Sequence, residues 1–179
     1  DDNDLIDFAA SSTEGASVLV IFQLPDNDFF STRANLKSNR LTNPGDLVTA
    51  DLNGDGLPDI ATLNENADDP IVVAFLRTGG TTPPTGCAAE KDGFVGCEYN
   101  APNESGLLKT LAAGTIDDDD AVDLVAGGDG LVALFFNGGD GSFDRSEIIS
   151  TPSVNFADLI TVDIDDDGRL DLAGVDSSA

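Results

Sequence analysis

The nine residues from Asp51 to Asp59 read Asp-Leu-Asn-Gly-Asp-Gly-Leu-Pro-Asp, and this short pattern organises the whole sequence. In general form it is D-x-[DN]-x-[DN]-G-x-x-D followed by apolar residues, and it returns intact from Asp163 to Asp171. A degenerate copy runs from Thr115 to Asp123, with Asp120 in place of the glycine at the sixth position. A pattern that recurs along a chain indicates a protein built from similar structural units.

The start of the sequence cuts a fourth copy of the pattern. Asp1, Asn3 and Asp7 fill its third, fifth and ninth positions, and Asp4 replaces the glycine. The first ligand of this copy would lie upstream of residue 1, so we expect it to be incomplete within the given sequence.

Apolar runs flank the loops in the same order each time. A short run precedes each complete loop, and a longer run rich in β-branched and aromatic residues follows each of the first three loops. Such runs predict buried strands, whereas no segment shows the period of an amphipathic helix. The sequence therefore predicts an all-β fold in which each repeat holds about four short strands. The short runs are 47–50, 111–113 and 159–162, and the long ones are 18–22, 71–76 and 131–136.

The loops carry the oxygen ligands that a hard cation needs. Ca²⁺ takes roughly six to eight oxygens, and side chains at alternating positions of a tight loop can point inward together. Positions 1, 3, 5 and 9 supply side chains, position 7 can add a backbone carbonyl, and glycine at position 6 allows the positive φ of the turn. The predicted calcium ligands are Asp51, Asn53, Asp55, Leu57 and Asp59; Asp163, Asp165, Asp167, Arg169 and Asp171; and Thr115, Asp117, Asp119, Ala121 and Asp123, together with Asp1, Asn3 and Asp7 of the incomplete copy.

Three other interpretations of the loops are possible. An EF-hand needs a bidentate Glu at position 12 and helices on both sides, but that position is Thr62, Ala126 or Gly174. Acidic surface turns without metal remain an alternative, although several carboxylates within nine residues repel one another without a cation. A high-salt habitat explains the sign of the charge but neither the periodic loops nor the scarcity of Glu. We therefore favour calcium.

Composition excludes several classes of function. The 179 residues include 34 acidic and 8 basic ones, for a net charge of −26, which repels nucleic acid and anionic membranes and attracts cations. His and Trp are absent, which removes the commonest general base, and we expect no enzymatic activity.

No apolar run reaches the ~20 residues of a membrane span. No signal peptide is present, so an exported protein would already have lost it.

The two cysteines, Cys87 and Cys97, lie in a polar stretch rich in Gly, Thr and Pro. Their spacing is not that of a zinc or redox motif. We expect a local disulfide that pins a surface insertion over residues 78–105, which implies an oxidising compartment and a secreted or cell-surface protein. Two unpaired thiols are the alternative.

The sequences DLNGDGLPDIA, DIDDDGRLDLAG and LVALFFNGGDGSF resemble the FG-GAP/VCBS repeats of integrin α-chains and of bacterial secreted proteins. The resemblance covers most of the chain outside the cysteine insertion. It implies β-propeller blades of four-stranded antiparallel sheets, with calcium held between the first two strands of a blade. It also implies the side-chain ligands given above for the three later loops, apart from Thr115.

The whole chain is expected to be one domain with about three blades, which makes it a partial or shared propeller. Residues 1–44, 45–106 and 107–154 would form blades, and 155–179 would begin another. Open terminal strands can pair with other chains, so the expected partners are further blades, other copies in a head-to-tail assembly or filament, and an extracellular protein or glycan. The expected function is that of a calcium-binding structural or adhesive module; a carbohydrate-binding or polysaccharide-active protein is the alternative.

Overall fold

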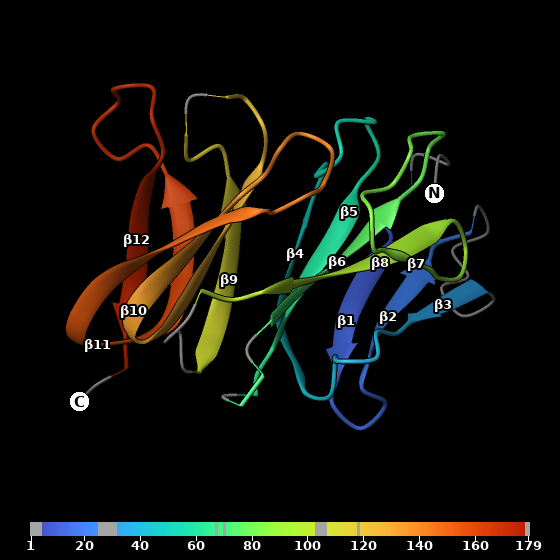
Figure 1. Ribbon diagram of the computed structural model, residues 1–179, viewed down its shortest axis with the longest axis horizontal. Coiled ribbons are helices and arrows are strands. Elements are labelled where there is room, and N and C mark those ends of the chain that lie inside the picture. Colours follow the sequence, from blue (N-terminus) through green and yellow to red (C-terminus); the bar gives the residue numbers. More distant parts are fainter. Residues whose placement is uncertain are drawn as a thin grey trace.

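The structure is a computed structural model that describes residues 5–24, 32–66, 68–69, 71–102, 107–117 and 119–177. Every regular element within these ranges is a β-strand, which confirms the predicted all-β class. The strands form three antiparallel sheets of three, five and four strands that do not close into a ring. Figure 1 shows the sheets side by side along the long axis of the molecule, with the first and third at opposite ends. The described part contains no helix long and apolar enough to cross a membrane.

The first sheet has the order β1 (Phe8–Ser12), β2 (Ser17–Phe22) and β3 (Thr32–Leu36). Its central strand, β2, contains the predicted apolar run. Val18, Val20 and Phe22 are buried, while the intervening residues are partly exposed. This alternation is that of a strand with only one face on a core.

The second sheet lies in the middle of the row and is the most buried. It contains β4 (Pro44–Ala50), β5 (Asp59–Asn64), β6 (Ile71–Arg77), β8 (Phe94–Asn100) and the short β7 (Ala88–Ala89), with β8 lying between β6 and β7. Every residue of β5 is buried, as are those of β6 before Arg77. A strand covered on both faces has no need of polar alternation, which explains the unbroken apolar run 71–76.

The third sheet contains β9 (Leu108–Gly114), β10 (Asp123–Phe136), β11 (Arg145–Val162) and β12 (Asp171–Asp176). The 14 residues of β10 would span about 46 Å if the strand were straight. However, the backbone N–H of Asn137, just after the strand, donates to the Asp123 carboxylate at its start. β10 therefore folds back on itself, and Gly130, with φ of 77°, lies at the reversal. Figure 1 shows this hook.

The long strand β11 also reverses. Its first part pairs with β10 between Arg145 and Ser150, and its second part pairs with β12 up to Val162. The Thr161 hydroxyl then donates to the carbonyl of Ala113 at the end of β9. Residues 156–162 of β11 together with β12 form an antiparallel pair that we call the terminal pair.

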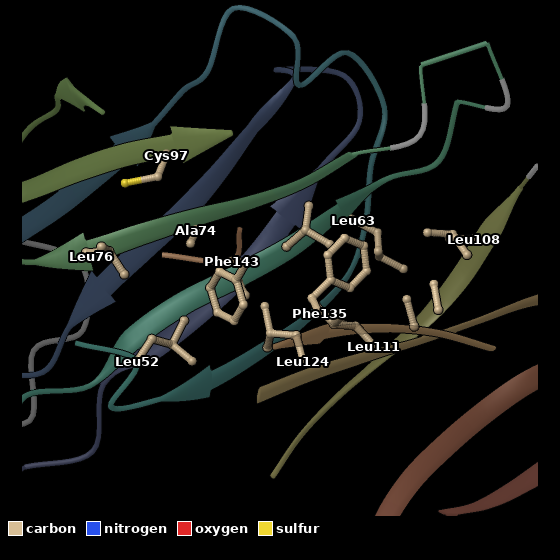
Figure 2. Packing of buried hydrophobic residues seen from close by; sticks show 14 of the residues in the cluster. Leu52, Leu63, Ala74, Leu76, Cys97, Leu108, Leu111, Leu124, Phe135 and Phe143 are labelled. Carbon is tan, nitrogen blue, oxygen red and sulfur yellow. The ribbon is translucent and has the colours of Figure 1, made fainter. Parts of the chain in front are cut away.

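Apolar clusters fill the spaces between successive sheets. One joins the first and second sheets, and another joins the second and third. A smaller one lies within the third sheet, between β9 and β10 on one side and Leu159 of the terminal pair on the other. Figure 2 shows side chains of the second and third sheets meeting in the largest cluster. The sheets are therefore held together mainly by burial of apolar surface. The residues of that cluster labelled in Figure 2 are Leu52, Leu63, Ala74, Leu76, Cys97, Leu108, Leu111, Leu124, Phe135 and Phe143.

Cys87 and Cys97 form the expected disulfide. The surrounding segment is only partly the surface insertion that the sequence predicts, because Phe94–Asn100 is strand β8, which pairs with β6 along its whole length. Phe94 is buried against the first sheet. The disulfide thus links the strand to the exposed stretch that precedes it, and the blade limits themselves stay a prediction.

Candidate metal centres

The loop between β11 and β12, residues 163–171, brings carboxylates together most closely. One oxygen each from Asp163, Asp165 and Asp171 lies within 4.8 Å of the others. No other trio of His, Cys, Asp or Glu among the described residues meets this spacing. Three carboxylates from positions 1, 3 and 9 fit a hard divalent cation, because their oxygens can reach one central ion. Asp167 at position 5 and the Arg169 carbonyl, which the sequence also predicts as ligands, are not part of this trio, and the ligand set stays a prediction.

A backbone wrap around position 1 shapes this loop. The Asp163 carboxylate accepts hydrogen bonds from the N–H groups of Asp166, Asp167 and Gly168 at 2.7–3.2 Å. Gly168 at position 6 has φ of 85°, as the sequence predicts for this turn. These hydrogen bonds shape the loop from within the chain.

The loop between β4 and β5, residues 51–59, is built in the same way. Asp51 accepts from the N–H groups of Asp55 and Gly56, at 3.2 and 2.8 Å. Asn53 is anchored through its side-chain amide, which donates to the Arg77 carbonyl at 2.8 Å. Gly56 has φ of 82°. The carboxylates of this loop are not gathered as closely as those of loop 163–171, so its use as a cation site stays a prediction.

The third loop, residues 115–123, departs from this plan. Thr115 at position 1 is exposed and offers no carboxylate. Asp117 at position 3 pairs with the guanidinium of Arg145, with 2.7 Å between Nη2 and Oδ2. Asp120 at position 6 adopts φ of 61°, so an aspartate does accept the conformation that glycine has in the other loops.

All three loops share a turn at position 5. The backbone N–H of position 7 donates to the carboxylate of position 5, at 2.9 Å for Leu57 and Asp55, 3.0 Å for Ala121 and Asp119, and 2.9 Å for Arg169 and Asp167. The position 7 residues therefore lie beside the predicted ligands. Their carbonyls stay predicted ligands.

The ninth aspartate has a second, structural task in each repeat. One of its carboxylate oxygens accepts the backbone N–H of the residue at position 2. Leu52 donates to Asp59, Ile116 to Asp123, and Ile164 to Asp171. In the three sheets the other carboxylate oxygen accepts the N–H of the residue at or just after the end of the hairpin that follows the loop, which is β1–β2, β5–β6 or the folded-back strand β10. These contacts join Gln23 to Asp7, Arg77 to Asp59 and Asn137 to Asp123, at 2.6–2.9 Å.

Of the incomplete first loop, Asp1, Asn3 and Asp4 lie outside the described residues. Asp7 at its ninth position makes the structural contact just described. The repeat pattern thus extends to the first sheet, whereas its metal ligands stay a prediction.

Asp59 is electrostatically unusual. It is fully buried, and this burial raises the pKa of its carboxyl to about 7, against the opposing effect of its two backbone hydrogen bonds; the charges of Asp55 and Asp51 raise it further. An ion beside these groups would favour the charged form. A cation bound by the predicted ligands of this loop would therefore compete with this proton.

Two residues that the sequence analysis did not single out connect the loops to neighbouring sheets. Asn137, buried after β10, donates to the carbonyls of Leu52 and Val122 and so joins two loops. Asp46 on β4 accepts from the Leu111 N–H and the Thr110 hydroxyl of β9. The recurrence of Asp-Leu five residues before the loop, at Asp46 and Asp158, was the available signal for Asp46.

The fold and the loops define a class: all-β repeat proteins in which an acidic nine-residue loop joins the first two strands of each unit. The match to protein families agrees. Residues 116–174, about a third of the chain, match the family model of the FG-GAP-like repeat, which confirms the resemblance over a segment that contains most of loop 115–123 and all of loop 163–171. A search of curated proteins found no matching relative.

Proposed function

We propose that this protein is an extracellular, calcium-binding structural module with an adhesive role. The observation that carries the proposal is the clustering of Asp163, Asp165 and Asp171 within 4.8 Å, in a loop type that recurs between strands. A chain with 34 acids and 8 bases gains most from a ligand that neutralises its densest acidic clusters. Extracellular calcium modules bind at about 10⁻⁴–10⁻³ M, where calcium is plentiful.

In loop 163–171 the side chains of Asp163, Asp165, Asp167 and Asp171 would hold the ion, and calcium would supply the positive charge that offsets their mutual repulsion. The chain itself provides the rest. Asp163 orders the turn through three N–H groups, and Asp171 ties the loop to the start of β12 through Ile164. A preordered loop binds with less loss of conformational entropy.

Native mass spectrometry with calcium titration tests this proposal. Asp163→Asn should remove one bound ion and abolish the part of the calcium-dependent rise in melting temperature that comes from this loop. Asp129→Asn is the matched control, because Asp129 lies outside the nine-residue loops and pairs with Lys109 at the surface. If the wild-type protein binds no calcium at millimolar concentration, the proposed function is wrong.

An extracellular location is the finer part of the proposal. The Cys87–Cys97 disulfide is typical of proteins that fold in an oxidising compartment. We extend this to secretion or display at the cell surface, with an extracellular protein or a glycan as the ligand of the adhesive surface. Screening against an array of glycans and matrix proteins is the corresponding test.

The terminal pair supports association with another blade of the same kind. Ile160 precedes its loop by three residues, as Val48 does, and Val175 follows its loop by four residues, as Leu63 does. Val48 and Leu63 pack into the layer between the second and third sheets, whereas Ile160 and Val175 are 53% and 60% exposed. The terminal pair thus presents the same kind of apolar face that the second sheet buries against the third.

The first sheet presents the complementary face. Phe8, directly after the ninth aspartate, is 52% exposed. Its equivalents Ile60 and Leu124 are buried against the preceding sheet. The two exposed faces therefore correspond to the two sides of one sheet-to-sheet contact, and we propose that they bind each other between copies, head to tail.

Light scattering across a concentration series in calcium measures this association. Val175→Asp should shift the protein toward monomer, and Glu147→Gln, on an exposed part of β11 outside both faces, should leave the mass unchanged. A wild-type protein that stays monomeric at high concentration contradicts head-to-tail association and leaves the calcium proposal intact.

A further inference from the structure

The loop 115–123 lacks the group around which the other two loops are wrapped. At position 1, Asp51 accepts the backbone N–H groups of positions 5 and 6, and Asp163 accepts those of positions 4 to 6. Thr115 has no carboxylate for this purpose. The loop nevertheless keeps the turn at position 5 and the ninth-aspartate contacts. The described residues of the loop thus keep these contacts, although its donor set for a cation is reduced.

Arg145 brings a fixed positive charge to this loop. Its Nη2 lies 2.7 Å from Oδ2 of Asp117. The guanidinium also lies over the ring of Phe136, with 3.6 Å from Cζ to the ring centroid. Arg145, Asp117 and Asp119 line the same hollow of about 230 Å³. The ring and the ion pair together fix the guanidinium at the acidic side of the loop.

The second sheet shows which residue takes the place of Arg145 in a repeat whose loop has aspartate at position 1. Arg77 and Asn137 are equivalent, because each donates its N–H to the ninth aspartate of its loop. The residues just before them are Leu76 and Phe136, whose cross-strand partners are Val95 and Arg145. The sheet with Asp51 at position 1 thus has apolar Val95 at the place of Arg145.

We infer that Arg145 supplies to loop 115–123 the positive charge that calcium supplies to the other loops, so that this loop keeps its form without a metal ion. The inference rests on the proposed calcium function for its contrast with loops 51–59 and 163–171. Loop 115–123 then depends on an arginine, whereas loops 51–59 and 163–171 depend on a metal ion.

The direct test counts bound calcium ions by native mass spectrometry in single variants. Asp117→Asn should leave the number of ions equal to that of the wild-type protein, whereas Asp163→Asn should lower it by one. If Asp117→Asn also loses an ion, the inference is overturned. If neither variant loses an ion, the calcium proposal for loop 163–171 fails, and the stability measurement below decides the role of Arg145 independently.

That measurement follows the melting temperature in excess chelator. Arg145→Gln should lower it by roughly 2–4 °C, because the ion pair is partly exposed and the ring contact adds to it. The double variant Arg145→Gln/Asp117→Asn should have the same melting temperature as Arg145→Gln alone. By contrast, the effects of Asp117→Asn and Arg40→Gln on the melting temperature should add in their double variant, because the Arg40 guanidinium pairs with Asp69 instead. An Arg145→Gln protein that melts like wild type in chelator overturns the inference.

Discussion

Replacing Asp123 with alanine tests whether the ninth aspartate stabilises the fold independently of metal. The carboxylate accepts the N–H groups of Ile116 and Asn137, each at 2.8 Å, and Asp117 at 3.3 Å. Asp123→Ala leaves the two close donors without partners inside the protein, at about 1–3 kcal/mol each. The total is about 2–6 kcal/mol, and removal of a desolvated charge offsets part of it, which favours the lower half of that range.

The assay is thermal unfolding followed by circular dichroism, with calcium and with excess chelator. A loss of this size lowers the melting temperature by roughly 5–15 °C, and the drop should be present in chelator. Asp129→Ala in the same strand should shift it by only about 1–3 °C, because its ion pair with Lys109 is at the surface. If Asp123→Ala melts like wild type in chelator and differs only in calcium, the ninth aspartate is a ligand alone and the structural role is refuted.

Three further predictions concern the buried carboxyl, the core and the disulfide. Burial raises the pKa of the Asp59 carboxyl to about 7, so the calcium-free folded protein keeps a proton there that the unfolded chain releases above about pH 4. The free energy of unfolding should therefore fall as the pH rises from about 4 to 7 and level off above that. Asp59→Asn should reduce this pH dependence, measured by urea unfolding. Leu63→Ala should cost about 2–5 kcal/mol in the same assay, whereas Val175→Ala at the equivalent exposed position should cost below about 1 kcal/mol; equal losses would contradict the assignment of the faces. Reduction of Cys87–Cys97, ten residues apart, should lower stability by at most about 3 kcal/mol, and a larger loss in a reductant titration would show that the bond does more than close a short loop.

The main apolar strands follow from local sequence. The run 71–76 is rich in β-branched residues and the run 131–136 in leucine and phenylalanine, and both lie in buried strands. Strand β8 was missed, because Phe94–Asn100 interrupts its apolar residues with Gly96 and Glu98. Its pairing with β6 supplies the burial that its own sequence does not indicate. Tertiary context overrides weak strand propensity in such cases.

The turn geometry of the loops also follows from local sequence. Glycine or aspartate at position 6 adopts positive φ in each described loop, as the spacing predicts. The roles of Arg145, Asn137 and Asp46 could not be predicted in this way. Each contacts a residue 28 to 85 positions away in the chain, and a single sequence does not state which distant residues meet.

The sequence alone determined that this chain alternates strands with acidic nine-residue loops, since spacing, glycine conformation and apolar period are local properties of the polypeptide. Only the tertiary structure decided which faces of those strands are covered, which loop gathers its carboxylates and which loop meets an arginine. These depend on the stacking of sheets, where apolar burial between β-units brings side chains from separate repeats into contact. Copies that look alike in sequence can therefore have different electrostatic surroundings.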